Sequence, residues 1–370
     1  MIKVLFLIQN LSHGGAEKVL VNLANNLDKE KFSVTIQTLF DVGVNKQYLL
    51  PHINYKTVFK KCFRGNNTLF KLFGPKFLCK MIIKEEYDIV ASYLEGATTR
   101  IISGCCKKTK KIAWIHSSLT TPKKAAIGFR NVEEAVKIYN SLDRIVAVSM
   151  GVKEQFENNI KSTTPLLVLY NTNETDLIAL KAAELVDDVD FDKNIINICS
   201  VGKIVPVKGY DRLARVHKRL LNEGLKHKIF ILGMGSEQKK IERYLYENKL
   251  QYSFIFIGFR DNPHKYVAAC DFYVCSSHRE GFSTAITEAL LVETPVISTN
   301  CSGAKELLGE NNEYGLVVDN NEEGIYQGIK KMLLNPQLLK HYKKQAMIQR
   351  QKYSKEKTVS AVESMLEELL

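Results

Sequence analysis

Two lysines in the second half of the chain could act together on a phosphorylated ligand. Lys203 and Lys208 stand five positions apart in a loop that follows a buried run. Such a pair can hold a diphosphate by two point charges and stabilise it as a leaving group. Taken alone, the spacing also fits two exposed loop lysines, so the neighbouring motifs must decide between these interpretations.

A second motif, at 278–288, combines a glycine turn, a predicted helix start and two carboxylates. Gly281 lets the chain enter a tight loop, and the backbone amides of 282–285 form an anion cradle that the helix dipole supports. Glu280 precedes this cradle, and Glu288 lies one to two turns inside the helix. The two carboxylates could therefore reach different hydroxyl groups, one on a sugar and one on a ribose, which indicates a nucleotide-sugar site.

Three further glycine-containing loops are weaker signals. Gly233 lies in a Gly-Met-Gly turn ahead of a helix, which fits close approach to a nucleotide or a plain tight turn equally well. Ser302 and Gly303 open another helix, as a simple cap or as a second phosphate-facing loop. Gly14 and Gly15 open the first helix and permit close approach by a ligand, but their order matches neither a dinucleotide motif nor a P-loop, so NAD binding and ATP hydrolysis are disfavoured.

A histidine and the metal-binding residue types complete the candidates. His116 follows a predicted strand, 111–115, and so lies on the ligand-facing edge of a sheet. A single histidine also fits a structural role. The Asp-x-Asp at 188–190 precedes no matching strand, and the eight cysteines show no zinc spacing. We therefore expect no metal and no cofactor, and cysteines that serve as small core residues in a reducing compartment.

The elements that must position these residues alternate between β and α along the whole chain. This pattern predicts an α/β protein with two doubly wound parallel sheets, whose ligands bind at the carboxyl ends of the strands. The predicted strands are 2–8, 34–39, 89–92, 111–115 and 144–148, then 195–201, 228–232, 253–258, 272–275 and 295–299. The main predicted helices are 16–27, 210–222, 236–248, 263–269, 283–291, 336–353 and 355–370.

Length and composition agree with two globular domains. The chain has 370 residues, of which 45% are hydrophobic and 25% charged, and this balance excludes disordered and fibrous proteins. We expect an N-terminal domain over 1–183, an acidic linker or adjoining exposed loop over 184–194, and a C-terminal domain over 195–354. The first apolar run is too short for a signal peptide or for a span of ~20 residues, so a cytoplasmic location is expected.

The excess positive charge, +12 overall, is concentrated in the first half. Between Lys56 and Lys84 there is no acidic residue, and basic side chains alternate with phenylalanines at loosely helical spacing. This stretch fits a surface that lies on an anionic membrane, where each basic residue contributes ~1 kcal/mol. It also fits core phenylalanines beneath a solvated lysine face. Nucleic acid is the least favoured partner, because no RNA-binding aromatic motif or zinc-finger spacing accompanies the charge. The phenylalanines are Phe59, Phe63, Phe70, Phe73 and Phe77.

Taken together, five segments in order resemble the retaining family-4 glycosyltransferases of GT-B fold, of the bacterial surface-polysaccharide type. The most specific element is the pair of glutamates eight positions apart with Gly-Phe between them. The resemblance covers essentially the full chain. Its segments are GGAE at 14–17, VGKIVPVKGYDRL at 201–213, LGMGSE at 232–237, REGFSTAITEALLVETPVI at 279–297 and SGAKEL at 302–307.

The resemblance implies two Rossmann-like domains facing a central cleft, with the donor on the C-terminal domain and the acceptor on the N-terminal one. It also implies that a helix over about 355–370 crosses back to the first domain. Lys203 and Lys208 match the basic pair on the diphosphate, although arginine is more usual at 203 and lysine lacks its bidentate fork. Glu280 matches the glutamate that contacts the transferred sugar.

The remaining site residues follow from the same resemblance. Glu288 matches the glutamate that holds the ribose, and His116 matches a histidine on the acceptor side. Ser302 stands where glycine is common, and 291–294 replaces a usual small-residue segment; both departures affect packing more than chemistry. The other expected donor contacts are Gly14, Gly15, Gly233 and Gly303, then Gly258, Phe259 and Arg260 beside the base, and Gly281, Phe282, Ser283 and Thr284 around the sugar and phosphates.

The expected activity is a metal-independent, retaining hexosyl transfer from a nucleotide-sugar, expected to be a UDP-sugar. The expected acceptor is a lipid-linked saccharide or polysaccharide repeat in cell-surface polysaccharide synthesis, at the inner face of the plasma membrane. The acceptor hydroxyl would attack from the face that the diphosphate leaves, with a phosphate oxygen taking its proton. Two alternatives stay open: a GT-B nucleotide-sugar 2-epimerase, and a non-catalytic basic protein that binds membrane or nucleic acid.

Overall fold

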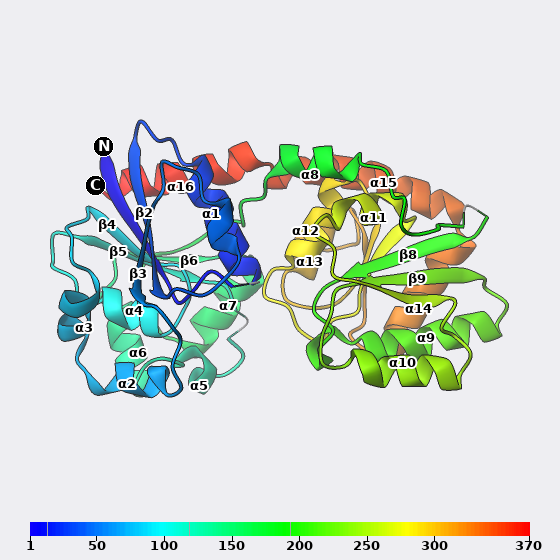
Figure 1. The fold of residues 1–370 in the computed structure, drawn as a ribbon, viewed down its shortest axis with the longest axis horizontal. Helices are drawn as coiled ribbons and strands as arrows, with labels where there is room; N and C mark the ends of the chain where they lie inside the picture. The colour runs from blue at the N-terminus through cyan, green and yellow to red at the C-terminus, as the bar shows by residue number, and fades with distance from the viewer. Residues whose placement is uncertain (13, 118, 193) are drawn as a thin grey trace. The chain divides into compact units, whose positions relative to one another are not determined.

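The computed structural model describes residues 1–12, 14–117, 119–192 and 194–370, and the chain forms two compact units (Figure 1). Unit 1 comprises 1–173 and 355–370, and unit 2 comprises 174–354. The sequence places the end of the first domain at 183. The structure instead assigns helix α8 (Thr175–Ala182) to unit 2, because this helix packs against α11 (His264–Ala269) and α12 (Thr284–Leu291).

Unit 1 is built on a parallel sheet that has seven strands within the described residues, in the order β3-β2-β1-β4-β5-β6-β7. Helices α1 and α16 lie over one face of this sheet, and α4 and α6 lie over the other (Figure 1). The strands are β1 Ile2–Ile8, β2 Phe32–Phe40, β3 Asn54–Phe59, β4 Ile89–Ser92, β5 Lys110–Ile115, β6 Arg144–Ala147 and β7 Leu166–Val168. The helices are α1 Gly15–Asn26, η1 Asn45–Tyr48, α2 Asn66–Leu72, α3 Pro75–Ile82, α4 Ala97–Ile102, α5 Pro122–Ala125, α6 Val132–Tyr139, α7 Met150–Asn159 and α16 Lys355–Glu368.

Unit 2 repeats the plan with a parallel sheet that has six strands in the described chain, in the order β10-β9-β8-β11-β12-β13. Helices α9, α10 and α14 cover one face, and α11, α12 and α15 lie on the other (Figure 1). The strands are β8 Ile196–Val201, β9 His227–Leu232, β10 Phe254–Gly258, β11 Phe272–Cys275, β12 Val296–Thr299 and β13 Leu316–Val318. The remaining helices are η2 Pro206–Lys208, α9 Tyr210–Asn222, α10 Gln238–Glu247, α13 Ala304–Leu308, α14 Glu322–Leu334, α15 Pro336–Gln349 and η3 Arg350–Tyr353.

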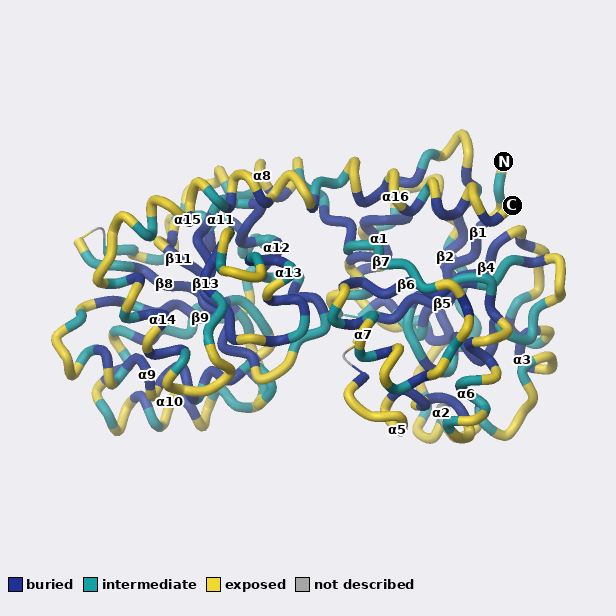
Figure 2. The backbone as a smooth tube through the Cα atoms, turned by 180° about the vertical axis from the view of Figure 1, so that it is seen from behind, coloured by how far each residue is buried: buried dark blue, intermediate teal, exposed yellow. Residues whose placement is uncertain are grey.

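The two predicted Rossmann-like sheets are confirmed, and burial explains why their central strands could be recognised. Residues 4–8 of β1 are fully buried, as are Ile198 and Cys199 of β8. Figure 2 shows the strands as the buried layer of each unit. A parallel strand covered by helices on both faces needs apolar residues at successive positions, so it forms a continuous apolar run.

Three short strands differ from the sequence-based expectation. β3 occupies the start of the basic stretch, where helical spacing is expected, and is a half-exposed edge strand. β7 and β13 are edge strands of three residues each. An edge strand lacks a second neighbour and much of its cover, so its sequence need not carry the long apolar run of a central strand.

The phenylalanines of the basic stretch divide between core and surface. Phe70 is buried, and Phe59 and Phe63 pack against each other and against Phe40 of β2. Phe73 and Phe77 are 40% and 54% exposed, with their rings stacked at a centroid distance of 5.1 Å. The core interpretation therefore holds for Phe70, while Phe59 and Phe63 are partly buried and the exposed phenylalanines of the stretch are Phe73 and Phe77.

The acidic segment 184–194, whose Lys193 lies outside the described residues, packs on unit 2. Asp188 forms an ion pair with Arg260 at 3.1 Å and accepts a hydrogen bond from Tyr266. Glu184 accepts a hydrogen bond from Asn262 at 2.9 Å. In the described parts of the chain, no helix combines the length and the apolar character that crossing a bilayer requires.

Candidate active site

The loops that carry Lys208 and Glu280 follow neighbouring strands of unit 2. β8 ends at Val201 and β11 ends at Cys275, and the two strands pair in parallel. Because parallel strands end at the same edge of the sheet, the two following loops meet there. Lys208 closes the short helix η2 in the first loop, and Glu280 lies in the second.

Lys208 and Glu280 form a partly buried ion pair. The Lys208 Nζ donates to Glu280 Oε1 at 2.7 Å, and the two side chains are 23% and 14% exposed. Burial is the largest single influence on the pKa of Lys208 and lowers it, but the charge and hydrogen bond of Glu280, together with the nearby Cys275 and Cys301, raise that pKa above its ordinary value. The Ser277 hydroxyl donates to the same carboxylate oxygen at 2.5 Å. The site therefore presents a positive charge and an oriented carboxylate next to each other.

Backbone contacts tie these two loops together. The Ser276 hydroxyl donates to the Lys208 carbonyl at 2.9 Å, and the His278 amide donates to the Val207 carbonyl at 2.7 Å. Gly209 adopts a φ of +65°, and a Cβ there would lie 2.3 Å from the Ser276 carbonyl oxygen. Only glycine accommodates both constraints, so Lys208 is held against the loop of Glu280.

The other predicted glycine turns are tightly packed. A Cβ on Gly233 would lie 2.0 Å from the Gly202 carbonyl oxygen, and the Gly233 amide donates to the Gly258 carbonyl at 2.8 Å. Gly303 has a φ of +78°, and a Cβ there would lie 3.2 Å from the Gly281 carbonyl oxygen. Close packing against neighbouring backbone therefore explains why these positions are glycine. That Gly233 and Gly303 contact the nucleotide-sugar stays a prediction.

The loop around Gly281 carries two further predicted donor contacts. Phe282 is buried and packs on Tyr353 at a ring distance of 5.8 Å. The Ser283 hydroxyl caps α12, which begins at Thr284, by accepting from the Ile286 amide at 3.4 Å. Ser302 lies beside this loop through its neighbour Gly303, and its hydroxyl oxygen is buried with no hydrogen-bond partner among the described residues. An unpartnered buried hydroxyl is unusual in a folded protein.

Glu288 and Arg260 each contact residues of unit 2. The Glu288 carboxylate lies 3.8 Å from Nδ1 of His264, and both side chains are nearly buried. Arg260 contacts Asp188 and also the hydroxyl of Tyr266 at 3.1 Å, while its neighbour Phe259 is 52% exposed. The predicted roles of Glu288 on a ribose and of Phe259 and Arg260 beside a base stay predictions.

Gly14, Gly15 and His116 lie in unit 1. Gly14 caps α1, which begins at Gly15. The His116 ring lies 4.8 Å from the Tyr93 ring, and its backbone amide donates to Glu95 at 3.0 Å. Burial lowers the pKa of His116 to about 3, so its imidazole is neutral near pH 7. Its Nε2 is buried and has no hydrogen-bond partner among the described residues, which is unusual for a buried polar atom.

The two predicted lysines differ in their surroundings. Lys203 is exposed on the loop after β8, whereas Lys208 is partly buried in its ion pair. Sequence reasoning missed Ser277, although a hydroxyl residue three positions before Glu280 was a visible signal. In the described ranges, no three side chains of the metal-ligating types His, Cys, Asp and Glu gather closely enough to hold a metal ion.

Comparison with known families covers nearly the whole chain. Residues 13–176 match the family described as Glycosyltransferase Family 4, and residues 183–349 match Glycosyl transferases group 1. The chain is a family-4-type glycosyltransferase of GT-B fold. The match to Glycosyl transferases group 1 includes the loops of both Lys208 and Glu280. The family assignment therefore agrees with the site at the sheet edge of unit 2.

One relative and two solved structures illustrate matches to this glycosyltransferase over almost its full length. It is 28% identical to the N-acetylgalactosamine-N,N'-diacetylbacillosaminyl-diphospho-undecaprenol 4-alpha-N-acetylgalactosaminyltransferase of Campylobacter jejuni, over 96% of this chain and 97% of the relative. The fold is similar to that of HepE from Anabaena in complex with UDP, with a TM-score of 0.80 and 19% identity over 99% of this chain and 100% of that one. The lipopolysaccharide outer core galactosyltransferase WaaB gives a TM-score of 0.74 with 17% identity, and both chains are covered completely.

Proposed function

We propose that this glycosyltransferase moves a sugar from a UDP-sugar to a lipid-linked saccharide during synthesis of a bacterial surface polysaccharide. The observation that carries the proposal is the Lys208–Glu280 pair at the carboxyl edge of the unit 2 sheet. The acceptor class is supported by the Campylobacter relative, whose name gives a diphospho-undecaprenol saccharide as its substrate. The donor class is supported by the UDP bound to a protein of the same fold.

The charges of the site fit the needs of such a transfer. Departure of UDP places negative charge on the diphosphate, which Lys208 and Lys203 stabilise together with the amides at the start of α12. Glu280 orients the sugar through its hydroxyl groups. The acceptor hydroxyl then attacks from the face that the diphosphate leaves, and a phosphate oxygen takes its proton, so the anomeric configuration is retained. His116 lies on the acceptor side in this proposal and acts as a neutral imidazole.

The first test is thermal stabilisation of the protein by nucleoside diphosphates and nucleotide-sugars in the presence of EDTA. A ligand at 100 times its Kd adds about 2.7 kcal/mol to the unfolding free energy, and we expect UDP and one UDP-sugar to do so. Stabilisation should persist with EDTA and be lost in Glu288→Ala. Transfer to a lipid-linked saccharide, followed by NMR of the product linkage, then tests retention. Donor conversion without any acceptor would instead support a 2-epimerase, and no response to any nucleotide would overturn the proposal.

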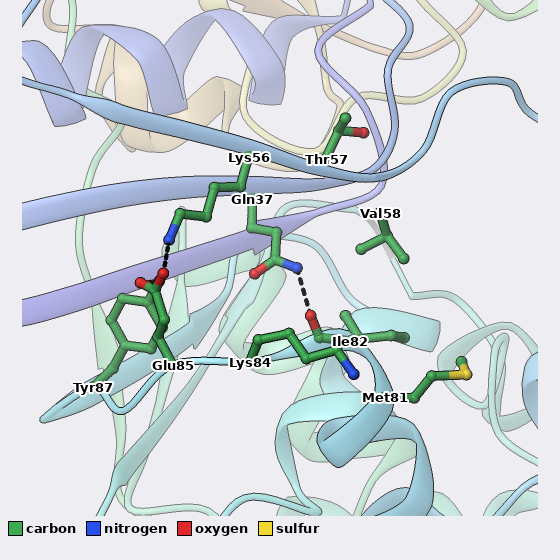
Figure 3. A pocket seen from close by; sticks show the side chains of 9 residues that line it. All are labelled: Gln37, Lys56, Thr57, Val58, Met81, Ile82, Lys84, Glu85 and Tyr87. Atoms are coloured by element: carbon green, nitrogen blue, oxygen red, sulfur yellow. Dashed lines mark hydrogen bonds and ion pairs between the residues drawn. The ribbon is translucent and has the colours of Figure 1, made fainter.

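We also propose that unit 1 rests on the anionic inner face of the plasma membrane. Its contact surface, here called the basic surface, consists of exposed residues on the β3–α2 connection, on the α2–α3 connection and on α3. Lys56 does not belong to it, because Lys56 forms an ion pair with Glu85 at a pocket of about 490 Å³ between β3 and the α3–β4 connection (Figure 3). The basic surface comprises Lys60, Lys61, Arg64, Lys76 and Lys80, with Phe73 and Phe77.

Replacing both Lys76 and Lys80 by glutamine should weaken binding to vesicles of phosphatidylglycerol. Each lysine contributes ~1 kcal/mol near an anionic leaflet, so the double variant should bind roughly tenfold or more weakly. Sedimentation of the protein with vesicles measures the effect. Vesicles of phosphatidylcholine mixed with phosphatidylglycerol are compared with vesicles of pure phosphatidylcholine, each at low and high salt. The matched control replaces Lys239 and Lys240, two exposed lysines of α10, and should bind as wild type. Equal binding by both double variants would contradict the basic surface as the contact.

A further inference from the structure

Side chains of unit 2 donate hydrogen bonds to the backbone of the loop between β11 and Glu280. Its consecutive backbone carbonyls at 276–278 each accept hydrogen bonds from the body of the unit. Arg212 of α9 donates to the Ser276 carbonyl through Nε at 3.0 Å and Nη2 at 2.7 Å. Thr299 at the end of β12 donates to the Ser277 carbonyl at 2.7 Å. Asn320, before α14, donates to the His278 carbonyl at 2.9 Å.

Arg212 and Asn320 are themselves joined. The Arg212 Nη2 donates to Asn320 Oδ1 at 2.8 Å, and Nη1 donates to the Asn320 backbone carbonyl at 3.3 Å. Both polar atoms of the Asn320 side-chain amide therefore have partners. Its oxygen accepts from the Arg212 guanidinium, and its nitrogen donates to the His278 carbonyl. An amide can satisfy both partners in only one orientation, so Arg212 fixes the donor that holds His278.

The surroundings of Arg212 differ from those of the other arginines of α9. Arg215 and Arg219 are about half exposed and pair with Glu322 and Glu323 of α14. Arg212 is 4% exposed, and the hydrogen bonds described for it go to carbonyl and amide oxygens. Burying a guanidinium without a carboxylate costs free energy, and hydrogen bonds to oriented oxygens offset that cost. A residue needed only to fill the core beneath α9 would be apolar.

We infer that Arg212 and Asn320 are positioning residues for the active-site loop. By fixing the carbonyls of Ser276 and His278, they turn the Ser277 hydroxyl and the Glu280 carboxylate toward Lys208. This inference rests on the proposed function only in that it assigns the positioned carboxylate to donor binding. The loop geometry itself is independent of what the loop binds.

The substitution Asn320→Asp separates positioning from stability. Aspartate keeps an acceptor for Arg212 and adds an ion pair, so the melting temperature should stay within a few degrees of wild type. It loses the donor to His278 and places a carboxylate oxygen against that carbonyl. Without any ligand, amide hydrogen exchange of the peptide 276–282 should become about tenfold faster. With the UDP-sugar, kcat should fall by about 10–100-fold, because small displacements of a positioning group have effects of this size, while UDP affinity changes less.

Arg219→Gln is the matched control, because it also removes a contact between α9 and α14 but leaves the loop carbonyls untouched. Its exchange and kcat should equal those of wild type. Wild-type exchange and kcat in Asn320→Asp would overturn the inference. Faster exchange in a protein that transfers no sugar would uphold the loop geometry and reject the proposed function. If Asn320→Asp melts far below wild type, Arg212→Lys is measured instead, and unchanged exchange in that variant would equally overturn the inference.

Discussion

Lys208→Met should lower kcat/KM for the UDP-sugar by about 10²–10³-fold, the range found when one preorganised charge donor is removed from a transition state. Methionine keeps most of the aliphatic stem, which lies close to Gly202, and removes only the ammonium group. Two effects then add to each other. The departing diphosphate loses a positive charge, and the Glu280 carboxylate loses the partner that holds it at 2.7 Å. Initial rates of UDP release measure the loss.

Comparison with four other variants assigns this effect to the ion pair. Lys208→Arg keeps the charge and should retain more activity than Lys208→Met. Glu280→Gln should cost a similar factor, and the double variant should cost little more than either single one, because residues that act as a unit are not additive. Lys203→Met removes the exposed lysine and should have a smaller effect. If the losses for Lys208 and Glu280 simply multiply, the two residues act separately and the pair is incidental.

The parts of the site that could be predicted from the sequence are those fixed by local patterns. Lys208 and Glu280 each follow an apolar run, so both loops could be placed at the carboxyl edge of the sheet without coordinates, and the structure adds that their strands β8 and β11 are neighbours. Arg212 gave no such signal. In the sequence it is one of several arginines on a helix, and its partners Ser276 and Asn320 are 64 and 108 positions away. A buried contact between distant loops depends on how strands are ordered across the sheet, which residue spacing does not specify.

The fold shows the same division between local and distant information. Central strands such as β1 and β8 were recognisable because both faces are buried. The edge strand β3 was not, because it is half exposed and lies within a lysine-rich stretch. The domain boundary followed composition in the sequence, where the acidic segment is conspicuous. In the structure it follows packing, since α8 and then Asp188 already contact unit 2.

A buried pair of histidines that sequence reasoning did not single out should make unit 2 sensitive to acid. His217 Nδ1 lies 2.8 Å from His227 Nε2, and the other ring nitrogens contact the Ser253 hydroxyl and the Leu225 carbonyl, each at 2.8 Å. In the neutral pair, His227 Nδ1 donates to the carbonyl, so its Nε2 accepts and His217 Nδ1 carries the proton. An added proton would place a positive charge on a buried imidazole, and burial disfavours the charged form.

Burial lowers the pKa of His217 to about 3 and that of His227 to about 4, whereas a histidine in the unfolded chain titrates near 6.5. The unfolded state then binds more protons at any pH between these values, so the unfolding free energy decreases as the pH falls below 6.5. One such histidine costs about 1.4 kcal/mol per pH unit, or about 3 kcal/mol at pH 4.5. The contribution of the two neutral histidines to the stability of unit 2 is thus fully present above pH 6.5 and is progressively lost as the pH falls toward 3.

Urea unfolding followed by circular dichroism at pH 7.5 and 5.0 measures this dependence. His217→Asn keeps a donor for His227 and removes one titrating group, so the loss of stability between the two pH values should shrink toward half. His52→Gln changes an exposed histidine of unit 1 and should leave the loss unchanged. The chain has one tryptophan, and Trp114 belongs to unit 1. Its fluorescence should therefore follow the same acid response in wild type and His217→Asn, because the titrating histidine removed lies in the other unit. An equal loss of stability in all three proteins would show that carboxylates, and not the buried histidines, govern the response to acid.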